Sequence, residues 1–257
     1  MFTISAKTPS VPPGERVYAV GDIHGRLDLL DRLLEMIAAY EAARPCAGTR
    51  LIFLGDYIDR GADSRRVIER LQQGIPGGLK AHFLRGNHEA IMLRCLEGPA
   101  MFGNWAANGG LATLKSYGVD ASFASDARTV MGELLEVLPE THLAFLRSLK
   151  TTMEVGDYFF VHAGVRPGVP LASQTDEDCL FIREKFLRHR GSFGKIVVHG
   201  HTPVSEPEVL ANRIGIDTGS FFSGRLTALR LEGTTRAFLT AEGEGQWRER
   251  QSLTDDA

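Results

Sequence analysis

The sequence predicts an α/β fold in which two mixed β-sheets pack face to face with helices outside. Apolar runs at 17–20, 51–54 and 82–84 each end in a polar loop that precedes a helical pattern. The intervals between Asp22, Asp56 and Asn87 are 34 and 31 residues, about the length of one βαβ unit. From Thr151 the pattern changes to short β-rich runs. Parallel units followed by a mainly antiparallel half favour two packed sheets.

The first half of the chain is expected to form three strand–loop–helix units within residues 15–95. Residues 1–14 are rich in proline and should form a loose lead-in. A helix is predicted from about Leu27 to Tyr40, because leucines recur there on one face. Residues 99–150 look mostly helical and predict a small cap.

The second half supplies five predicted strands, at 158–162, 196–199, 214–217, 226–231 and 237–240. Polar residues at strand ends run from Asp22 to His201, and one site drawing on so much chain needs one core. We therefore expect a single domain over residues 15–241. Residues 242–257 are polar and should form a frayed tail.

Composition excludes several classes of protein. The 257 residues are 43% hydrophobic and carry a net charge of −3, which gives no general attraction to nucleic acid or anionic membrane. No apolar run approaches the length of a membrane span, and no secretory signal is apparent at the start. The three cysteines are isolated, as in a reducing compartment. We expect a cytoplasmic protein without nucleic acid or membrane partners.

Five short blocks carry residues that can bind metal. They are GDIHG at 21–25, GDYIDRG at 55–61, GNHE at 86–89, HAG at 162–164 and HGHTP at 199–203. Their carboxylate, amide and imidazole groups suit hard or borderline divalent ions. Ligands gather at the carboxyl ends of parallel strands, so these blocks should converge. His199 and His201 lie two apart on one strand face, and periodicity alone does not choose between them.

With these blocks in place, residues 16–231 resemble the PPP-type phosphoprotein phosphatases of the calcineurin-like metallophosphoesterase superfamily. The similarity is greatest to the compact bacterial and phage branch typified by phage lambda phosphatase. It extends to Asn104-Trp105, to Asn108-Gly109-Gly110, and to the segment 216–227 with Asp217 and Phe222. The resemblance implies the calcineurin-like metallophosphoesterase fold with a helical cap.

The resemblance also implies a dinuclear centre with two divalent ions roughly 3.5 Å apart. Asp22 and His24 would bind the first ion and Asp56 would bridge both, while Asn87, His162 and His201 would complete the second. The GHT-type block selects His201 over His199. Mn, Fe, Zn and Ni all accept this donor set, with Mn expected to serve in vitro. The implied nucleophile is a bridging hydroxide that attacks phosphorus in line.

Three further roles follow from the same resemblance. Arg60, Arg183 and Asn87 would hold phosphate oxygens, and His88 would be the general acid for the leaving oxygen, oriented by Asp59. Arg183 could instead belong to a solvated helix face within a basic run. Asp217 should brace the histidine loops. Trp105 and the Asn108-Gly109-Gly110 turn would form either cap packing or a lip of the substrate groove. His82, His142 and His189 are interpreted as packing or surface residues.

The expected function is a metal-dependent serine/threonine protein phosphatase acting on phosphorylated proteins or peptides, with phosphotyrosine as a side substrate. A dinucleoside tetraphosphate hydrolase of the same fold is the alternative. The DRG turn and Glu89 argue against it, because that branch usually departs from DRG and carries Asp at the position of Glu89. A silent phosphoprotein-binding module should have lost a ligand or the acid, and none is missing. A P-loop enzyme is excluded because GxxxxGK[ST] is absent.

Overall fold

The computed structural model describes residues 8–244 of the chain. Three β/α units come first: β1 Glu15–Val20, α1 Leu27–Ala43, β2 Gly48–Phe53, α2 Ser64–Gln72, β3 Lys80–Phe83 and α3 Asn87–Glu97. The cap contains α4 Phe102–Trp105, a π-turn at Ala106–Gly110, α5 Leu111–Ser116, α6 Ala127–Val137 and α7 Glu140–Ser148. Short 3-10 turns lie at Pro76–Gly78, Pro99–Met101 and Leu171–Ser173.

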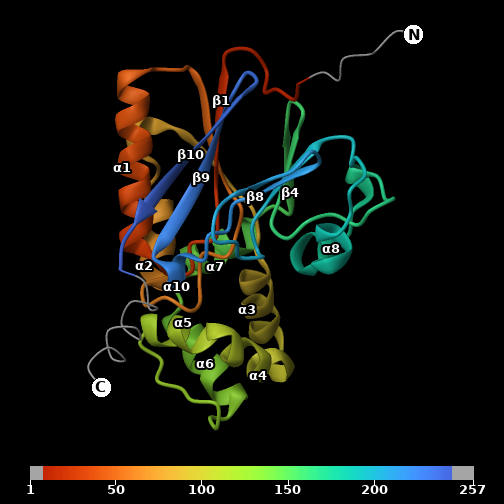
Figure 1. The fold of residues 1–257 in the computed structure, drawn as a ribbon. Coiled ribbons are helices and arrows are strands. Elements are labelled where there is room, and N and C mark those ends of the chain that lie inside the picture. The colour runs from red at the N-terminus through yellow and green to blue at the C-terminus, as the bar shows by residue number, and fades with distance from the viewer. Residues whose placement is uncertain (1–7, 245–257) are drawn as a thin grey trace, which may run out of the picture.

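The rest of the chain is built from shorter pieces. They are β4 Thr152–Val155, β5 Tyr158–Val161, α8 Asp176–Phe181, α9 Glu184–Leu187, β6 Ile196–His199, β7 Glu208–Val209, β8 Arg213–Gly215, α10 Ser220–Ser223, β9 Arg225–Glu232 and β10 Thr235–Glu242. Figure 1 shows α4, α5 and α6 gathered at one end of the sheets, with α1 and α8 on opposite sides of the molecule. Among residues 8–244, no helix has both the length and the apolar character to cross a bilayer.

Two five-stranded mixed sheets form the centre, which confirms the predicted architecture. Their strand orders are β10-β9-β1-β2-β3 and β4-β5-β6-β8-β7. The strands β1, β2 and β3 are parallel, as are β5, β6 and β8. The expectation of a mainly antiparallel second half was wrong in one respect, because β5, β6 and β8 pair in parallel. The last two strands, β9 and β10, cross back to the first sheet, where β9 pairs antiparallel with β1.

The burial pattern of β1 and β9 explains this crossing. Val17 of β1 and Leu229 of β9 face the core between the two sheets. Tyr18 of β1 and Ala228 of β9 face the opposite way, toward the cluster that contains the α1 leucines. Since side chains alternate along a strand, both faces of β9 are apolar, and only a position inside the first sheet buries both of them.

The ends of the described chain pack on the sheets. Val11, within the predicted lead-in, is buried, and its N–H donates to the Gly233 carbonyl at 3.0 Å. The Ser10 N–H donates to Asp157 Oδ2 at 2.9 Å. The lead-in before residue 8 and the tail after 244 lie outside the described residues, so the domain limits stay a prediction.

Candidate metal centre

All the predicted metal-binding residues lie at one edge shared by the two sheets. Asp22 and His24 follow β1, Asp56 follows β2, and Asn87 opens α3 just after β3. From the second sheet, His162 follows β5 directly and His201 comes two residues after β6. The parallel strands of both sheets end at this edge, as expected where ligands bind in α/β folds.

The backbone at this edge is held in an uncommon conformation. Within residues 8–244, every non-glycine residue with a positive φ belongs to the blocks singled out from the sequence. They are His24 (47°), Asp56 (52°), Asp59 (72°), Arg60 (69°) and His201 (63°). Such angles are costly for residues with a Cβ and persist where surrounding structure enforces them, most often at functional sites.

One group of donors converges on the amide of Asn87. Asn87 Oδ1 lies 2.9 Å from His162 Nε2 and 2.8 Å from His201 Nδ1. His162 Nε2 also lies 3.4 Å from Asp56 Oδ2. Ligand atoms of Asp56, His162 and His201 all fall within 4.8 Å of one another. This is the second ion's expected donor set, gathered in one place.

A second group shares Asp56. Ligand atoms of His24, Asp56 and His88 also lie within 4.8 Å of one another, with His24 Nε2 at 3.5 Å from Asp56 Oδ2. His88 enters this group in place of the expected Asp22. Asp22 stands beside the group, where its Oδ2 accepts the His201 N–H at 3.0 Å.

The imidazole rings of His24 and His162 have the orientation that is usual for metal-binding histidines. His24 Nδ1–H donates to the Ile58 carbonyl at 2.8 Å, and His162 Nδ1–H donates to the Leu54 carbonyl at 3.0 Å. Each Nε2 therefore turns its lone pair toward Asp56. Backbone carbonyls commonly orient metal-binding imidazoles in this way.

Buried donor atoms without a hydrogen-bond partner also fit divalent ions. Among the described residues, Asp22 Oδ1 and His201 Nε2 are buried and unpartnered at this edge. Unpaired buried polar atoms are costly, and an ion is one way to satisfy them. The Asp, His and Asn groups are thus positioned for a divalent metal site, and their chemistry leaves the identity of the metal open.

The electrostatics of the histidines suit ligation. Burial lowers the pKa of His24 and of His162, and lowers that of His201 to about 2. All three rings are therefore neutral near pH 7, the form in which imidazole binds metal.

The two predicted carboxylate ligands shift in opposite directions. Burial acts to raise the pKa of Asp56, but the surrounding histidines, His162 first, outweigh it and the pKa is lowered. Burial and the neighbouring Asp217 raise the pKa of Asp22 well above its ordinary value. A cation next to Asp22 would relieve this repulsion.

Two glycines of the motifs leave space for the carboxylates. A Cβ on Gly86 would lie 2.0 Å from Asp56 Oδ1, and a Cβ on Gly200 would lie 2.0 Å from Asp22 Oδ1. No real Cβ is tolerated at that distance, so the backbone can approach these oxygens only at glycine.

His88 and Asp59 form a tightly held pair. His88 Nδ1 lies 2.6 Å from Asp59 Oδ2, and Asp59 is fully buried. Burial acts to lower the pKa of His88, but the carboxylates of Asp56 and Asp59 outweigh it and the pKa is raised. A histidine with a raised pKa and a fixed Nδ1 can present a proton from Nε2.

The cap fixes Asp59 through two residues whose part the sequence did not reveal. Trp105 Nε1–H donates to Asp59 Oδ2 at 2.9 Å, and Thr113 Oγ1–H donates to Asp59 Oδ1 at 2.5 Å. Trp105 is fully buried, which decides for cap packing over a substrate lip. The only sequence signal for these contacts was that Asn104-Trp105 forms part of the resemblance to phosphoprotein phosphatases. No feature of the sequence pointed to Thr113.

The two predicted phosphate-binding arginines lie beside different residues of the centre. The Arg60 guanidinium lies 3.3 Å from His88 Nε2, and the backbone N–H of Arg60 donates to the Gly109 carbonyl at 3.2 Å. Arg183 is exposed and lies at the rim, where its Nη2 is 3.5 Å from the His201 carbonyl. Both arginines are therefore beside the donor cluster.

Glu89 is a further residue whose role the sequence did not indicate. Its buried carboxylate accepts N–H groups from Asp56 (3.0 Å), Tyr57 (2.8 Å), Ile58 (3.3 Å) and Gly86 (2.9 Å). It ties the Asp56 loop to the start of α3, which carries Asn87. Burial, with Asp56 second, raises the pKa of Glu89 to about 7.

The remaining histidines, His199 included, do not belong to either donor group. His199 Nδ1 lies 3.0 Å from the Gly200 carbonyl, and its ring packs edge-on against Phe186 at 4.9 Å. His142 is buried in the cap beside Tyr117. Asp217 is next to the site; its Oδ1 accepts the Gly219 N–H at 2.8 Å and its carbonyl accepts the Val204 N–H at 2.9 Å.

Comparisons with known proteins agree with this geometry. Residues 15–225 match the model of the family described as calcineurin-like phosphoesterase. A bis(5'-nucleosyl)-tetraphosphatase PrpE [asymmetrical] from Anoxybacillus flavithermus is 29% identical over 232 residues, which cover 82% of this chain and 88% of the relative. The PrpE of the same name from Oceanobacillus iheyensis is 26% identical, over 84% of this chain and 88% of the relative.

Solved structures share the fold. A putative diadenosine tetraphosphatase has a TM-score of 0.62 at 20% identity and covers 93% of this chain and 100% of its own. A cold-active protein-tyrosine phosphatase from a psychrophilic Shewanella species has a TM-score of 0.53 at 18% identity, covering 91% and 85%. At these identities the likeness concerns the fold alone. The phosphoprotein phosphatase branch thus stays a prediction.

Proposed function

Because this chain belongs to the calcineurin-like phosphoesterase family, we propose that it is a metal-dependent hydrolase of dinucleoside tetraphosphates that cleaves them asymmetrically. The observation that carries the proposal is the name shared by the two relatives reported above, each aligned over more than four fifths of this chain. This reverses the preference drawn from the DRG turn and Glu89.

The donor groups of the centre support phosphoryl chemistry. Divalent ions, when held by Asp22, His24, Asp56, Asn87, His162 and His201, would polarise phosphate oxygens and lower the pKa of water toward neutrality. In the hydrolysis, a water oxygen bonds to phosphorus, the bond from phosphorus to the bridging oxygen breaks, and one proton passes to that departing oxygen. The products are a nucleoside monophosphate and a nucleoside triphosphate.

The chain's own residues would position and protonate the substrate. Arg60, beside His88, and Arg183, beside His201, can hold non-bridging phosphate oxygens. His88 Nε2, with Nδ1 fixed by Asp59, would give its proton to the departing oxygen. The cap residues Trp105 and Thr113 hold Asp59 and so fix the direction of that proton.

A phosphoprotein phosphatase is the second candidate. Its support is the set of blocks GDYIDRG and GNHE, with the His88–Asp59 pair formed and both arginines at the site. Phosphorylated serine or threonine peptides would then be the substrates, with phosphotyrosine and aryl phosphates as weaker ones.

One comparison of rates separates the candidates. Protein loaded with Mn²⁺ is assayed side by side on diadenosine tetraphosphate, phosphoserine and phosphothreonine peptides, and phosphotyrosine peptides, with products resolved by chromatography. We expect the largest kcat/KM on the tetraphosphate, with AMP and ATP as products, and no turnover after EDTA. Peptide turnover without tetraphosphate cleavage would refute the proposal in favour of the second candidate. Activity that survives complete metal removal would refute both.

A further inference from the structure

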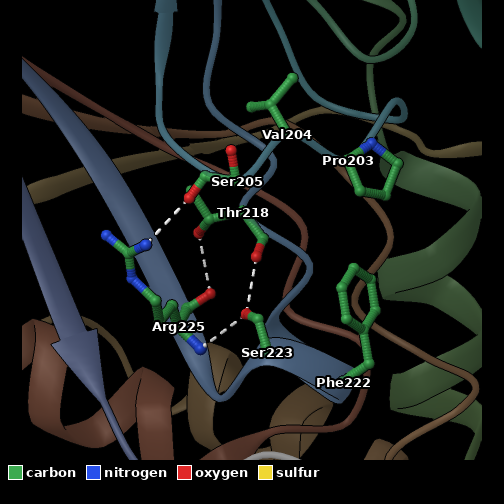
Figure 2. Close-up of a pocket in the computed structure, with 7 residues that line it drawn as sticks. All are labelled: Pro203, Val204, Ser205, Thr218, Phe222, Ser223 and Arg225. Atoms are coloured by element: carbon green, nitrogen blue, oxygen red, sulfur yellow. Dashed lines mark hydrogen bonds between the residues drawn. The ribbon is translucent and has the colours of Figure 1, made fainter. Parts of the chain in front are cut away.

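A pocket of about 520 Å³ lies between the loop after β6 and the segment around α10. Pro203, Val204 and Ser205 line it from the loop after β6, and Thr218, Phe222 and Arg225 line it from the segment around α10 (Figure 2). Its volume lies in the range of small-molecule sites. The sequence blocks did not predict a role for this pocket.

Residues that line the pocket are close neighbours in the chain of residues at the metal centre. Pro203 is two residues beyond His201, and two residues span at most about 7 Å. Phe221, the neighbour of Phe222, has its ring 5.5 Å from the His24 ring and 4.6 Å from the Arg60 guanidinium carbon. A ligand whose phosphate meets Arg60 would therefore lie near Phe221, the chain neighbour of the pocket residue Phe222.

The walls of the pocket are fixed by hydrogen bonds. Ser223 Oγ–H donates to the Thr218 carbonyl at 2.6 Å, Thr218 Oγ1–H donates to the Arg225 carbonyl at 2.8 Å, and Arg225 Nη1–H donates to the Ser205 carbonyl at 2.9 Å (Figure 2). The Glu206 carboxylate holds the same Arg225 guanidinium at 2.6 Å. The two loops are therefore joined before any ligand arrives, which reduces the entropy lost on binding.

Phe222 is itself fixed in orientation. Its ring packs edge-on against Phe221 at 4.9 Å. It also covers Gly219, where an added Cβ would lie 2.2 Å from the ring tip. In Figure 2 the ring points up toward Pro203. The pocket thus combines a fixed aromatic ring, a proline and a valine with polar side chains that are hydrogen-bonded within its walls.

We propose that this pocket is the subsite for a nucleobase of the substrate, which stacks on Phe222 while an attached phosphate lies at the metal centre. The inference rests on the proposed function and names the part of the chain that would select a nucleotide. A nucleobase is flat and aromatic, and it gains from stacking on a phenyl ring without sequence-specific hydrogen bonds. A phosphoserine or phosphothreonine side chain offers no such ring.

The test uses two ligands that differ only by the base. AMP and ribose 5-phosphate compete with an aryl phosphate for the Mn²⁺-loaded protein, and each inhibition constant is measured. Stacking on one aromatic ring corresponds to about tenfold tighter binding of AMP. We expect this AMP preference to disappear in Phe222→Ala. It should persist in Phe123→Ala, a matched loss of an exposed phenylalanine in the cap that is 69% exposed.

The outcomes separate the subsite from the proposed function. Equal inhibition by AMP and ribose 5-phosphate overturns the subsite, even if the tetraphosphate is cleaved. An AMP preference that depends on Phe222, together with no cleavage of the tetraphosphate, overturns the proposed function and leaves the subsite. If Phe222→Ala does not fold, Ser205→Trp at the exposed mouth should block the pocket and abolish the same preference. Retention of the preference in folded Ser205→Trp overturns the subsite.

Discussion

The replacement His88→Asn distinguishes a proton donor from a metal ligand at the same position. His88 Nε2 is 3.8 Å from Asp56 Oδ2, close enough for the histidine to join the first donor group. Arg60 Nη2 lies 3.3 Å from the same Nε2, however, and a guanidinium there disfavours a metal ion at that nitrogen. The short contact of Nδ1 with Asp59 favours the proton-donor role. We therefore expect His88→Asn to keep its metals.

The magnitude follows from what the substitution removes. Loss of a positioned acid costs about 10²–10⁴-fold in rate. The loss should be greatest for an alkyl phosphate, whose departing alkoxide needs the proton, and smaller for a nitrophenyl phosphate. Asp59 keeps the hydrogen bonds from Trp105 and Thr113, so the free energy of unfolding should fall by only about 1.5–3 kcal/mol.

The assay measures bound metal by mass spectrometry and kcat for a series of leaving groups. His142→Asn serves as control, because it removes a buried histidine of the cap outside the donor groups. Loss of metal from His88→Asn, with the control unchanged, would show that His88 is a ligand. Near-normal turnover of alkyl phosphates with full metal content would refute the proton-donor role.

Three further predictions concern two residues beside the centre and one histidine of the cap. Gly86→Ala should weaken metal binding in calorimetric titration, because its Cβ would lie 2.0 Å from Asp56 Oδ1; Gly98→Ala, which meets no atom within 4 Å, should bind normally. Glu89→Gln should weaken metal binding about 10–100-fold, and unchanged affinity would contradict a positioning role. Burial lowers the pKa of His142 below its ordinary 6.5, so the unfolded chain takes up that proton more readily. Its contribution to stability is complete above pH 6.5 and is lost as the pH falls toward the folded-state pKa; urea unfolding of His142→Gln should show a pH slope smaller by up to one proton.

The strand-end blocks could be predicted from sequence because their cause is local. Each block directly follows an apolar strand in the sequence. The glycines at 86 and 200 also mark the blocks, although the carboxylate oxygens that exclude a Cβ there belong to other blocks. The preference for His201 over His199 as a metal-binding residue also agrees with the geometry. His201 adopts a positive φ that swings its Nδ1 to Asn87, while His199 stays in its strand and packs on Phe186.

What the sequence did not predict depends on pairing between distant segments. The placement of β9 beside β1 follows from burial on both faces of β9. A strand buried on both faces shows no alternation of apolar and polar residues from which its neighbour could be predicted. Trp105 and Thr113 of the cap donate hydrogen bonds to Asp59, from which they are separated by 46 and 54 positions in the sequence. The pocket around Phe222 likewise needs two loops that meet only in the folded chain.

The same distinction explains why the motifs do not decide between a phosphopeptide and a nucleotide substrate. Glu89 is fully buried, and its carboxylate accepts hydrogen bonds from four backbone N–H groups. Asp59 is fully buried between His88 and the cap. Neither side chain is exposed where it could contact the body of a substrate. Their identities therefore report how the phosphate-cleaving centre is held together, and this requirement is the same for a peptide and for a nucleotide. Residues that can discriminate must lie outside the blocks and face the pocket, as Phe222 does. Exchange of Glu89 for Asp should consequently alter metal affinity and rate for all substrates together, whereas exchange of Phe222 should alter their ratio. If Glu89→Asp instead changed the preference between tetraphosphate and phosphopeptide, this separation of roles would be wrong.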